Sequence, residues 1–129
     1  MQIRESAEMY LETILVLSKK GPVRSIDIAR EMGFSRPSVS VTIHNLAAEH
    51  YVKIEEDGSI TLEDKGREIA ERIYERHLVL SALLVRIGVP EDIASEDACK
   101  IEHDISVTTF DCIKKVIENN NLTSDILGK

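Results

Sequence analysis

Three residues in the C-terminal third of the chain have side chains that can bind a metal ion. Cys99, Glu102 and His103 follow each other closely, on a helix that we expect over residues 90–104. On such a helix they share one face, which differs from the face set by the neighbouring apolar residues. A thiolate, a carboxylate and an imidazole that converge from one helix are typical ligands of a divalent transition metal. The alternative interpretation is a half-exposed cysteine beside a surface glutamate and histidine.

Three further residues can add to such a site. His77 flanks the apolar stripe of a long helix expected over residues 63–86, where it can face a neighbouring helix. Met9 and Glu12 lie one turn apart on a helix expected over residues 6–18, on the side away from its apolar stripe. A hydrogen-bonded histidine and an exposed methionine would explain the same positions without a metal.

The elements that must position these residues are mostly helical. Hydrophobic periodicity predicts helices over residues 6–18, 26–32, 36–49, 63–86, 90–104 and 107–118. Serine caps are expected at four of their starts, namely Ser6, Ser25, Ser35 and Ser106. The apolar face of the long helix is expected to consist of Ile69, Ile73, Leu80, Leu84 and Ile87. Two β-prone runs, 51–54 and 60–62, flank an Asp-Gly turn and predict a β-hairpin.

The order of helix, short helix, glycine turn, helix and hairpin is that of a winged helix-turn-helix, whose second short helix enters the major groove of DNA. Residues 13–48 are net positive in a chain whose net charge is −7, which fits a local footprint on DNA phosphates. The residues expected to contact DNA are Arg24, Ser35, Arg36, Pro37, Ser38, Ser40, Thr42 and His44. Ordinary solubilising residues on an exposed helix are the alternative. The hairpin tip, residues 55–57, is acidic, whereas a wing that touches DNA is usually basic.

The chain has 129 residues, of which 43% are hydrophobic and 30% charged, a balance that excludes a membrane-spanning or disordered protein. We expect a DNA-binding domain over residues 1–64 and a helical metal-binding and dimerisation domain over residues 65–129. The second domain has more apolar residues than one small lobe can bury, notably Leu78, Val79, Leu80, Leu83, Leu84, Val85 and Ile87. A two-fold homodimer would cover them and match a palindromic operator. The two cysteines indicate reduced thiols in a cytoplasmic protein.

The chain resembles the diphtheria-toxin-repressor family of iron- and manganese-dependent transcriptional regulators. The matching segments are residues 8–12, 27–29, 35–40, 62–66, 76–77, 87–89 and 99–103. The resemblance implies a mostly α fold, in which an N-terminal winged helix-turn-helix with a short β-hairpin wing precedes a helical dimerisation domain. It also implies a non-enzymatic repressor that controls metal homeostasis, with Fe(II) or Mn(II) as co-repressor.

The metal site that the resemblance implies is mixed. The residues that match the main regulatory site of iron-type members are Met9, Cys99, Glu102 and His103. Glu12 and His77 match ligands of manganese-type members, which have carboxylates at the positions of Met9 and Cys99. Because sulfur ligands favour softer metals than manganese, we favour Fe(II), with Co(II), Ni(II) or Zn(II) as substitutes.

The sequence also departs from the family pattern. Ser81 and Ser95 stand where the iron-type ancillary site has ligands, and Val41 replaces a polar residue that reads bases in the iron-type repressor. We expect the shorter, manganese-type architecture, without the SH3-like third domain that iron-type members usually carry.

Three other functions fit parts of the pattern. A metal-independent winged-helix regulator that senses an organic ligand would keep the dimer and the DNA binding without a stoichiometric metal. A protein-interaction module would use the helix-turn-helix shape without DNA, which the acidic hairpin tip favours. A metal-dependent hydrolase would use Cys99, Glu102 and His103. Those three residues leave no separate general base, and no phosphate-binding glycine loop is present, so we expect no enzyme.

Overall fold

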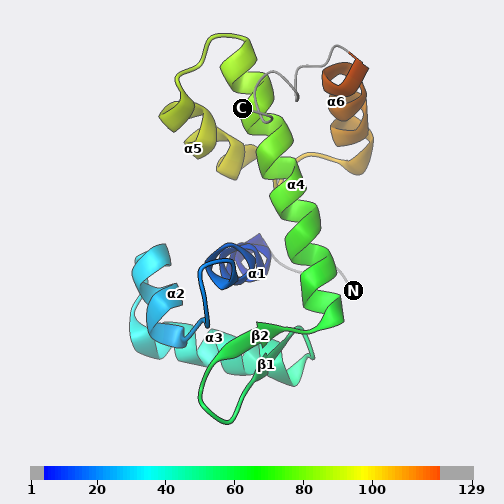
Figure 1. Cartoon of the computed structure of the whole chain (residues 1–129). Helices are drawn as coiled ribbons and strands as arrows, with labels where there is room; N and C mark the ends of the chain where they lie inside the picture. The colour runs from blue at the N-terminus through cyan, green and yellow to red at the C-terminus, as the bar shows by residue number, and fades with distance from the viewer. Residues whose placement is uncertain (1–4, 120–129) are drawn as a thin grey trace. The chain divides into compact units, whose positions relative to one another are not determined.

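The computed structural model describes residues 5–119, which form six helices and one two-stranded sheet (Figure 1). The elements are α1 (Glu5–Ser18), α2 (Ser25–Met32), α3 (Arg36–Ala48), β1 (Val52–Ile54), β2 (Ile60–Leu62), α4 (Asp64–Arg86), α5 (Glu91–Ile101) and α6 (Val107–Asn119). The predicted fold class, a mostly α chain with a winged helix-turn-helix followed by a helical domain, is confirmed. No helix in the described part of the chain is both long enough and apolar enough to cross a membrane.

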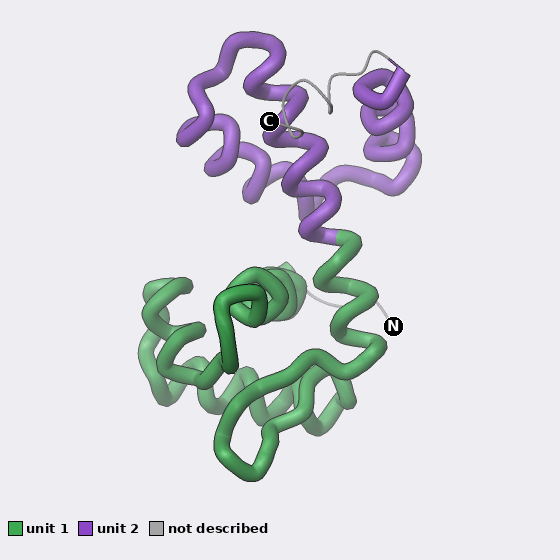
Figure 2. Tube along the Cα trace, viewed as in Figure 1, with its two compact units in different colours: residues 1–72 green, residues 73–129 purple. Residues whose placement is uncertain are grey.

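The chain forms two compact units, residues 1–72 and residues 73–129 (Figure 2). The units divide inside α4, which is one continuous helix with no linker. The boundary expected from the sequence, after residue 64, falls at the first residue of this helix.

The first unit holds α1, α2, α3 and the hairpin around one aliphatic core. The helix α3 buries Val39, Ile43 and Leu46. Gly33 ends α2 in the left-handed conformation, with φ of 71°. Ser35 then caps α3, since its Oγ accepts a hydrogen bond of 3.3 Å from the backbone N–H of Ser38. These two signals fix the tight turn that positions α3.

The hairpin is antiparallel, and Lys53 pairs with Thr61 at its centre. Ile60 extends the pairing beyond the hairpin, because its N–H donates to the carbonyl oxygen of Val23 over 2.7 Å. The segment before α2 therefore anchors the wing to the helix-turn-helix.

The second unit packs α4 and α6 around Val79, Phe110 and Ile117. Of the apolar face predicted for α4, Ile73 and Leu80 are buried. The prediction is wrong for Ile87, which lies beyond the last residue of the helix and is 69% exposed. Two of the residues expected at a dimer surface, Val79 and Leu80, are instead buried within this unit.

Seven of the twelve predicted helix ends differ from the structure, six of them by one residue and the end of α5 by three. Ser6 lies inside α1, which begins at Glu5. Arg24 rather than Ser25 is the N-cap of α2, because the carboxylate of Asp27 reaches back to accept the Arg24 N–H over 2.9 Å. The helix α5 ends at Ile101, which changes the surroundings of the candidate metal ligands described next.

Candidate functional site

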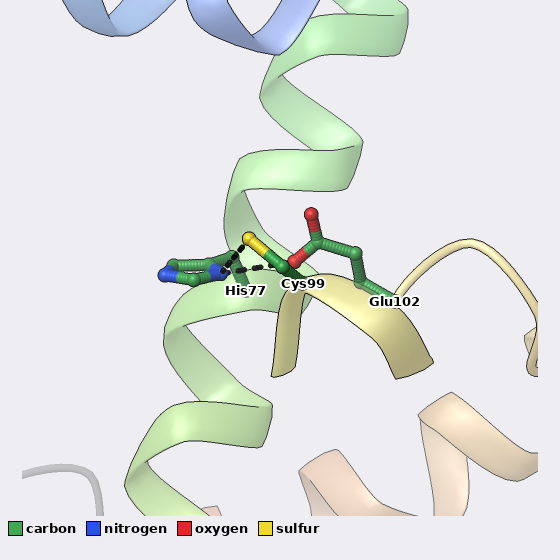
Figure 3. Close-up of side chains that lie close together, drawn as sticks. All are labelled: His77, Cys99 and Glu102. Carbon is green, nitrogen blue, oxygen red and sulfur yellow. Dashed lines mark hydrogen bonds and ion pairs between the residues drawn. The ribbon is translucent and has the colours of Figure 1, made fainter. Parts of the chain in front are cut away.

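Three side chains whose donor atoms can hold a metal ion cluster inside the second unit (Figure 3). His77 comes from α4, Cys99 from the last turns of α5, and Glu102 from the C-cap of α5. One ligand atom from each lies within 4.8 Å of the other two. Nδ1 of His77 is 3.0 Å from Oε2 of Glu102 and 3.9 Å from Sγ of Cys99. The geometry thus converges on one nitrogen, one oxygen and one sulfur donor.

Glu102 is fully buried, at 0% exposure. The expectation that its helix face points away from the core is wrong for this residue, because α5 has ended and Glu102 lies at the start of the turn into α6. Its Oε1 lies 3.4 Å from Nε2 of His103, yet no described residue donates a hydrogen bond to that oxygen. A buried carboxylate oxygen without a donor is costly unless a cation satisfies it. The site therefore fits a metal ion.

The same turn carries His103, whose side chain is 1% exposed. Four of the six predicted metal ligands, His77, Cys99, Glu102 and His103, therefore belong to α4, α5 and the turn after α5. The other two, Met9 and Glu12, lie on α1 in the first unit, where Met9 is 38% exposed.

Arg76 holds the turn that carries Glu102, a role that the sequence interpretation missed. Its Nη1 donates to the carbonyl oxygens of Glu102, at 3.0 Å, and Ile105, at 3.1 Å. Its guanidinium also lies over the ring of Phe110, 5.3 Å from the centroid. The signal in the sequence was a charged residue at a core position, in helical spacing with Ile73 and Leu80.

The electrostatics of the cluster favour a protonated His77 in the metal-free protein. The hydrogen bond to Cys99, followed by the one to Glu102, raises the pKa of His77 to about 10. The second ring nitrogen, Nε2, lies 3.3 Å from Oγ of Ser95. If Nε2–H donates to Ser95, Nδ1 is the nitrogen left to bind a metal once its proton is lost.

The predicted DNA-contacting residues of α3 differ in exposure. Arg36, Pro37, Ser38 and His44 are exposed, as is the capping residue Ser35. Ser40 and Thr42 are half-buried at the flanks of the helix. The residue at the centre of the exposed face is Val41, which is 62% exposed and was missing from the predicted contacts.

Arg24, another predicted DNA contact, binds the acidic hairpin tip. Its guanidinium donates to the backbone oxygen of Asp57, and its Nη2 lies 3.9 Å from the carboxylate of the same residue. Asp57 also accepts hydrogen bonds from the Ser59 hydroxyl, at 2.6 Å, and from the Ser59 backbone N–H, at 2.9 Å, which lower the pKa of the Asp57 carboxyl. Asp57 of the acidic tip thus stabilises the turn of the hairpin.

Family models match both parts of the chain. Residues 2–60 match the model described as the N-terminal DNA binding domain of the iron dependent repressor. Residues 63–124 match the model described as its metal binding and dimerisation domain. The two matches meet just before α4.

Three known proteins are similar to most of the chain. MntR, a helix-turn-helix transcriptional regulator of Lysinibacillus sphaericus, is 31% identical over 125 residues, which are 96% of this chain and 90% of the relative. The iron-dependent repressor IdeR of Mycobacterium bovis is 31% identical over 92% of this chain and 52% of the relative. A solved manganese-dependent transcriptional repressor in complex with manganese has a TM-score of 0.80 at 28% identity, over 87% of this chain and 52% of that one. The chain therefore spans about half the length of the last two proteins.

Proposed function

Because the chain belongs to the iron-dependent repressor family of metal-dependent, DNA-binding transcriptional regulators, we propose that it represses transcription while a divalent metal occupies the cluster around Glu102. This membership confirms the resemblance seen in the sequence motifs. The single observation that carries the proposal is the fully buried carboxylate of Glu102, placed among two imidazoles and a thiol. The alternative of a metal-independent regulator is not supported by the family match.

The ligands that we propose are His77, Cys99, Glu102 and His103, joined by Met9 and Glu12. The part of Met9 and Glu12 rests on their spacing along α1 and on the sequence resemblance. Oxygen and nitrogen donors suit both Fe(II) and Mn(II), whereas a thiolate and a thioether favour Fe(II), with Co(II), Ni(II) or Zn(II) as substitutes. Manganese is named for the solved repressor in complex with manganese, and iron is named for IdeR.

Two ligands of the cluster and one residue beside it have separate tasks in this proposal. His77 and Cys99 release their protons when they become ligands, and Arg76 keeps the backbone of Glu102 in place. A bound divalent cation supplies positive charge that compensates the thiolate and the carboxylates. Metal promotes DNA binding only if the protein binds the metal more tightly in the conformation that binds DNA than in its other conformations.

The partners that we propose are a second copy of the chain and a palindromic duplex DNA, in the cytoplasm, and we assign no catalytic activity. In the described part of the second unit, the exposed large hydrophobic residues are Ile87, Ile93, Val107 and Val116, at 69%, 47%, 62% and 54%. A two-fold dimer would bury such residues and place two copies of α3 on successive half-sites.

Titration of the reduced, metal-free protein with Co(II) is expected to give a saturable thiolate-to-metal charge-transfer band at roughly one or two ions per chain. The band should vanish in Cys99→Ser, because this substitution removes the sulfur donor. Cys112→Ser is the matched control, since Cys112 is the other exposed cysteine and lies on α6, outside the cluster. Absence of a band in the wild type, or its loss in the control variant, would contradict the proposed centre.

Metal affinity is expected to fall as the pH is lowered from about 8 to about 6, since Nδ1 of His77 and the thiol of Cys99 must lose protons to bind. The raised pKa of His77, about 10, means that this residue holds its proton throughout that range. Each displaced proton changes the apparent affinity about tenfold per pH unit. Calorimetric titration in buffers of different ionisation enthalpy counts the released protons, and a pH-independent affinity would contradict the assignment of these ligands.

A further inference from the structure

Val41 is the most exposed large hydrophobic residue of the described part of the first unit, at 62%. Its orientation is fixed by the opposite face of α3, where Val39, Ile43 and Leu46 are buried. Because the helical period places Val41 almost opposite Val39 and Ile43, the core holds its isopropyl group outward. An exposed valine in the middle of this helix offers only apolar contact to whatever the helix meets.

The residues around Val41 favour the binding of a polyanion that also presents an apolar group to this side chain. The helix α3 contains no acidic residue, although the whole chain has a net charge of −7. Arg36, Ser38 and His44 are exposed on neighbouring turns. His44 is oriented by a hydrogen bond of 2.8 Å between its Nδ1 and the carbonyl oxygen of Ser40. Exposed polar groups, and no carboxylate of α3, thus neighbour one protruding apolar side chain.

We propose that Val41 determines sequence specificity by packing against the C5 methyl group of a thymine in the major groove. This inference rests on the proposed function, since it requires that α3 enters the groove. Thymine is the base that presents a methyl group there, whereas the other base edges present hydrogen-bond donors or acceptors. Valine cannot pair with those polar groups, so any other base at this step would lose hydrogen bonds to water without gaining new ones.

The test begins with duplex DNA selected from a random library by the full chain loaded with Co(II). The selected sequences are expected to share an A·T pair at one fixed step in each half-site. Uracil is then substituted for each thymine in turn, which removes the methyl group alone. Wild-type affinity is expected to fall about fourfold per half-site at the step that Val41 contacts, as for one buried methyl group, and to stay unchanged at thymines elsewhere.

Val41→Ala supplies the second arm of the test. This variant should bind the selected duplex more weakly and lose most of its response to uracil at that step, because the two γ-methyl groups of valine that reach the thymine are gone. An unchanged Co(II) spectrum and melting temperature show that the variant is folded. An equal uracil penalty in wild type and variant, or selected half-sites without a fixed thymine, would overturn the role of Val41 while leaving DNA binding intact. If no duplex is enriched at all, the proposed function fails as well.

Discussion

Glu102→Gln is expected to abolish the stabilisation that metal gives to the wild-type protein. At a metal concentration about a hundredfold above the Kd, the wild type should gain about 2.7 kcal/mol. For a chain of this length, that gain raises the Tm by about 10 °C. The amide of glutamine keeps the size of the side chain but removes its charge, and loss of a central ligand should weaken binding at least about a hundredfold. The variant should then gain less than about 0.5 kcal/mol at the same metal concentration.

The metal-free Glu102→Gln variant should nevertheless fold. Glu102 is fully buried, and removing a buried charge relieves a desolvation cost. Its partner His77 can become neutral once the carboxylate is gone. Thermal melts of wild type and variant, with and without Mn(II) or Co(II), measure both effects. Glu96→Gln is the control, because Glu96 lies on the same helix and is exposed. A full metal-induced shift in Glu102→Gln would refute the proposed site.

Gly66→Ala is expected to destabilise the protein by about 1–3 kcal/mol, although alanine is the better helix former by about 1 kcal/mol. Gly66 is buried in the first turns of α4, and a Cβ there would overlap the backbone carbonyl of Tyr51. That carbonyl cannot easily withdraw, since it accepts the N–H of Glu63 over 3.0 Å. Because backbone meets backbone, no side-chain rotation relieves the overlap.

Denaturant unfolding of the metal-free protein measures this effect. Glu68→Ala is the matched control on the same helix, because Glu68 is exposed and its replacement should change the free energy of unfolding by less than about 0.5 kcal/mol. Gly66→Ala should also weaken DNA binding, since Tyr51 directly precedes β1 of the wing. A variant as stable as the wild type would show that α4 can shift away from Tyr51 at little cost.

The local signals of the sequence predicted the elements well. The Gly33 turn, the Ser35 cap and the Asp-Gly hairpin are properties of a few adjacent residues, and the structure has all three. The order of these elements was sufficient to predict the winged helix-turn-helix. The clustering of His77 with Cys99 was also anticipated, because helical spacing indicated which side chains flank an apolar stripe.

Helix ends were less predictable, because several neighbouring residues can cap the same helix. Arg24, not Ser25, became the N-cap of α2, because the carboxylate of Asp27 accepts the Arg24 N–H. The early end of α5 depended on the turn into α6, which Arg76 fixes from another helix.

The sequence by itself determined which donor atoms this protein has and how they are spaced along its helices. Only the tertiary structure decided that Glu102 is buried and that Arg24 binds the hairpin tip. The physical reason is that periodicity defines directions around the axis of a single helix. Burial and ion pairing depend on residues distant in the sequence, such as Asp57 for Arg24, and the packing of the fold brings those residues together.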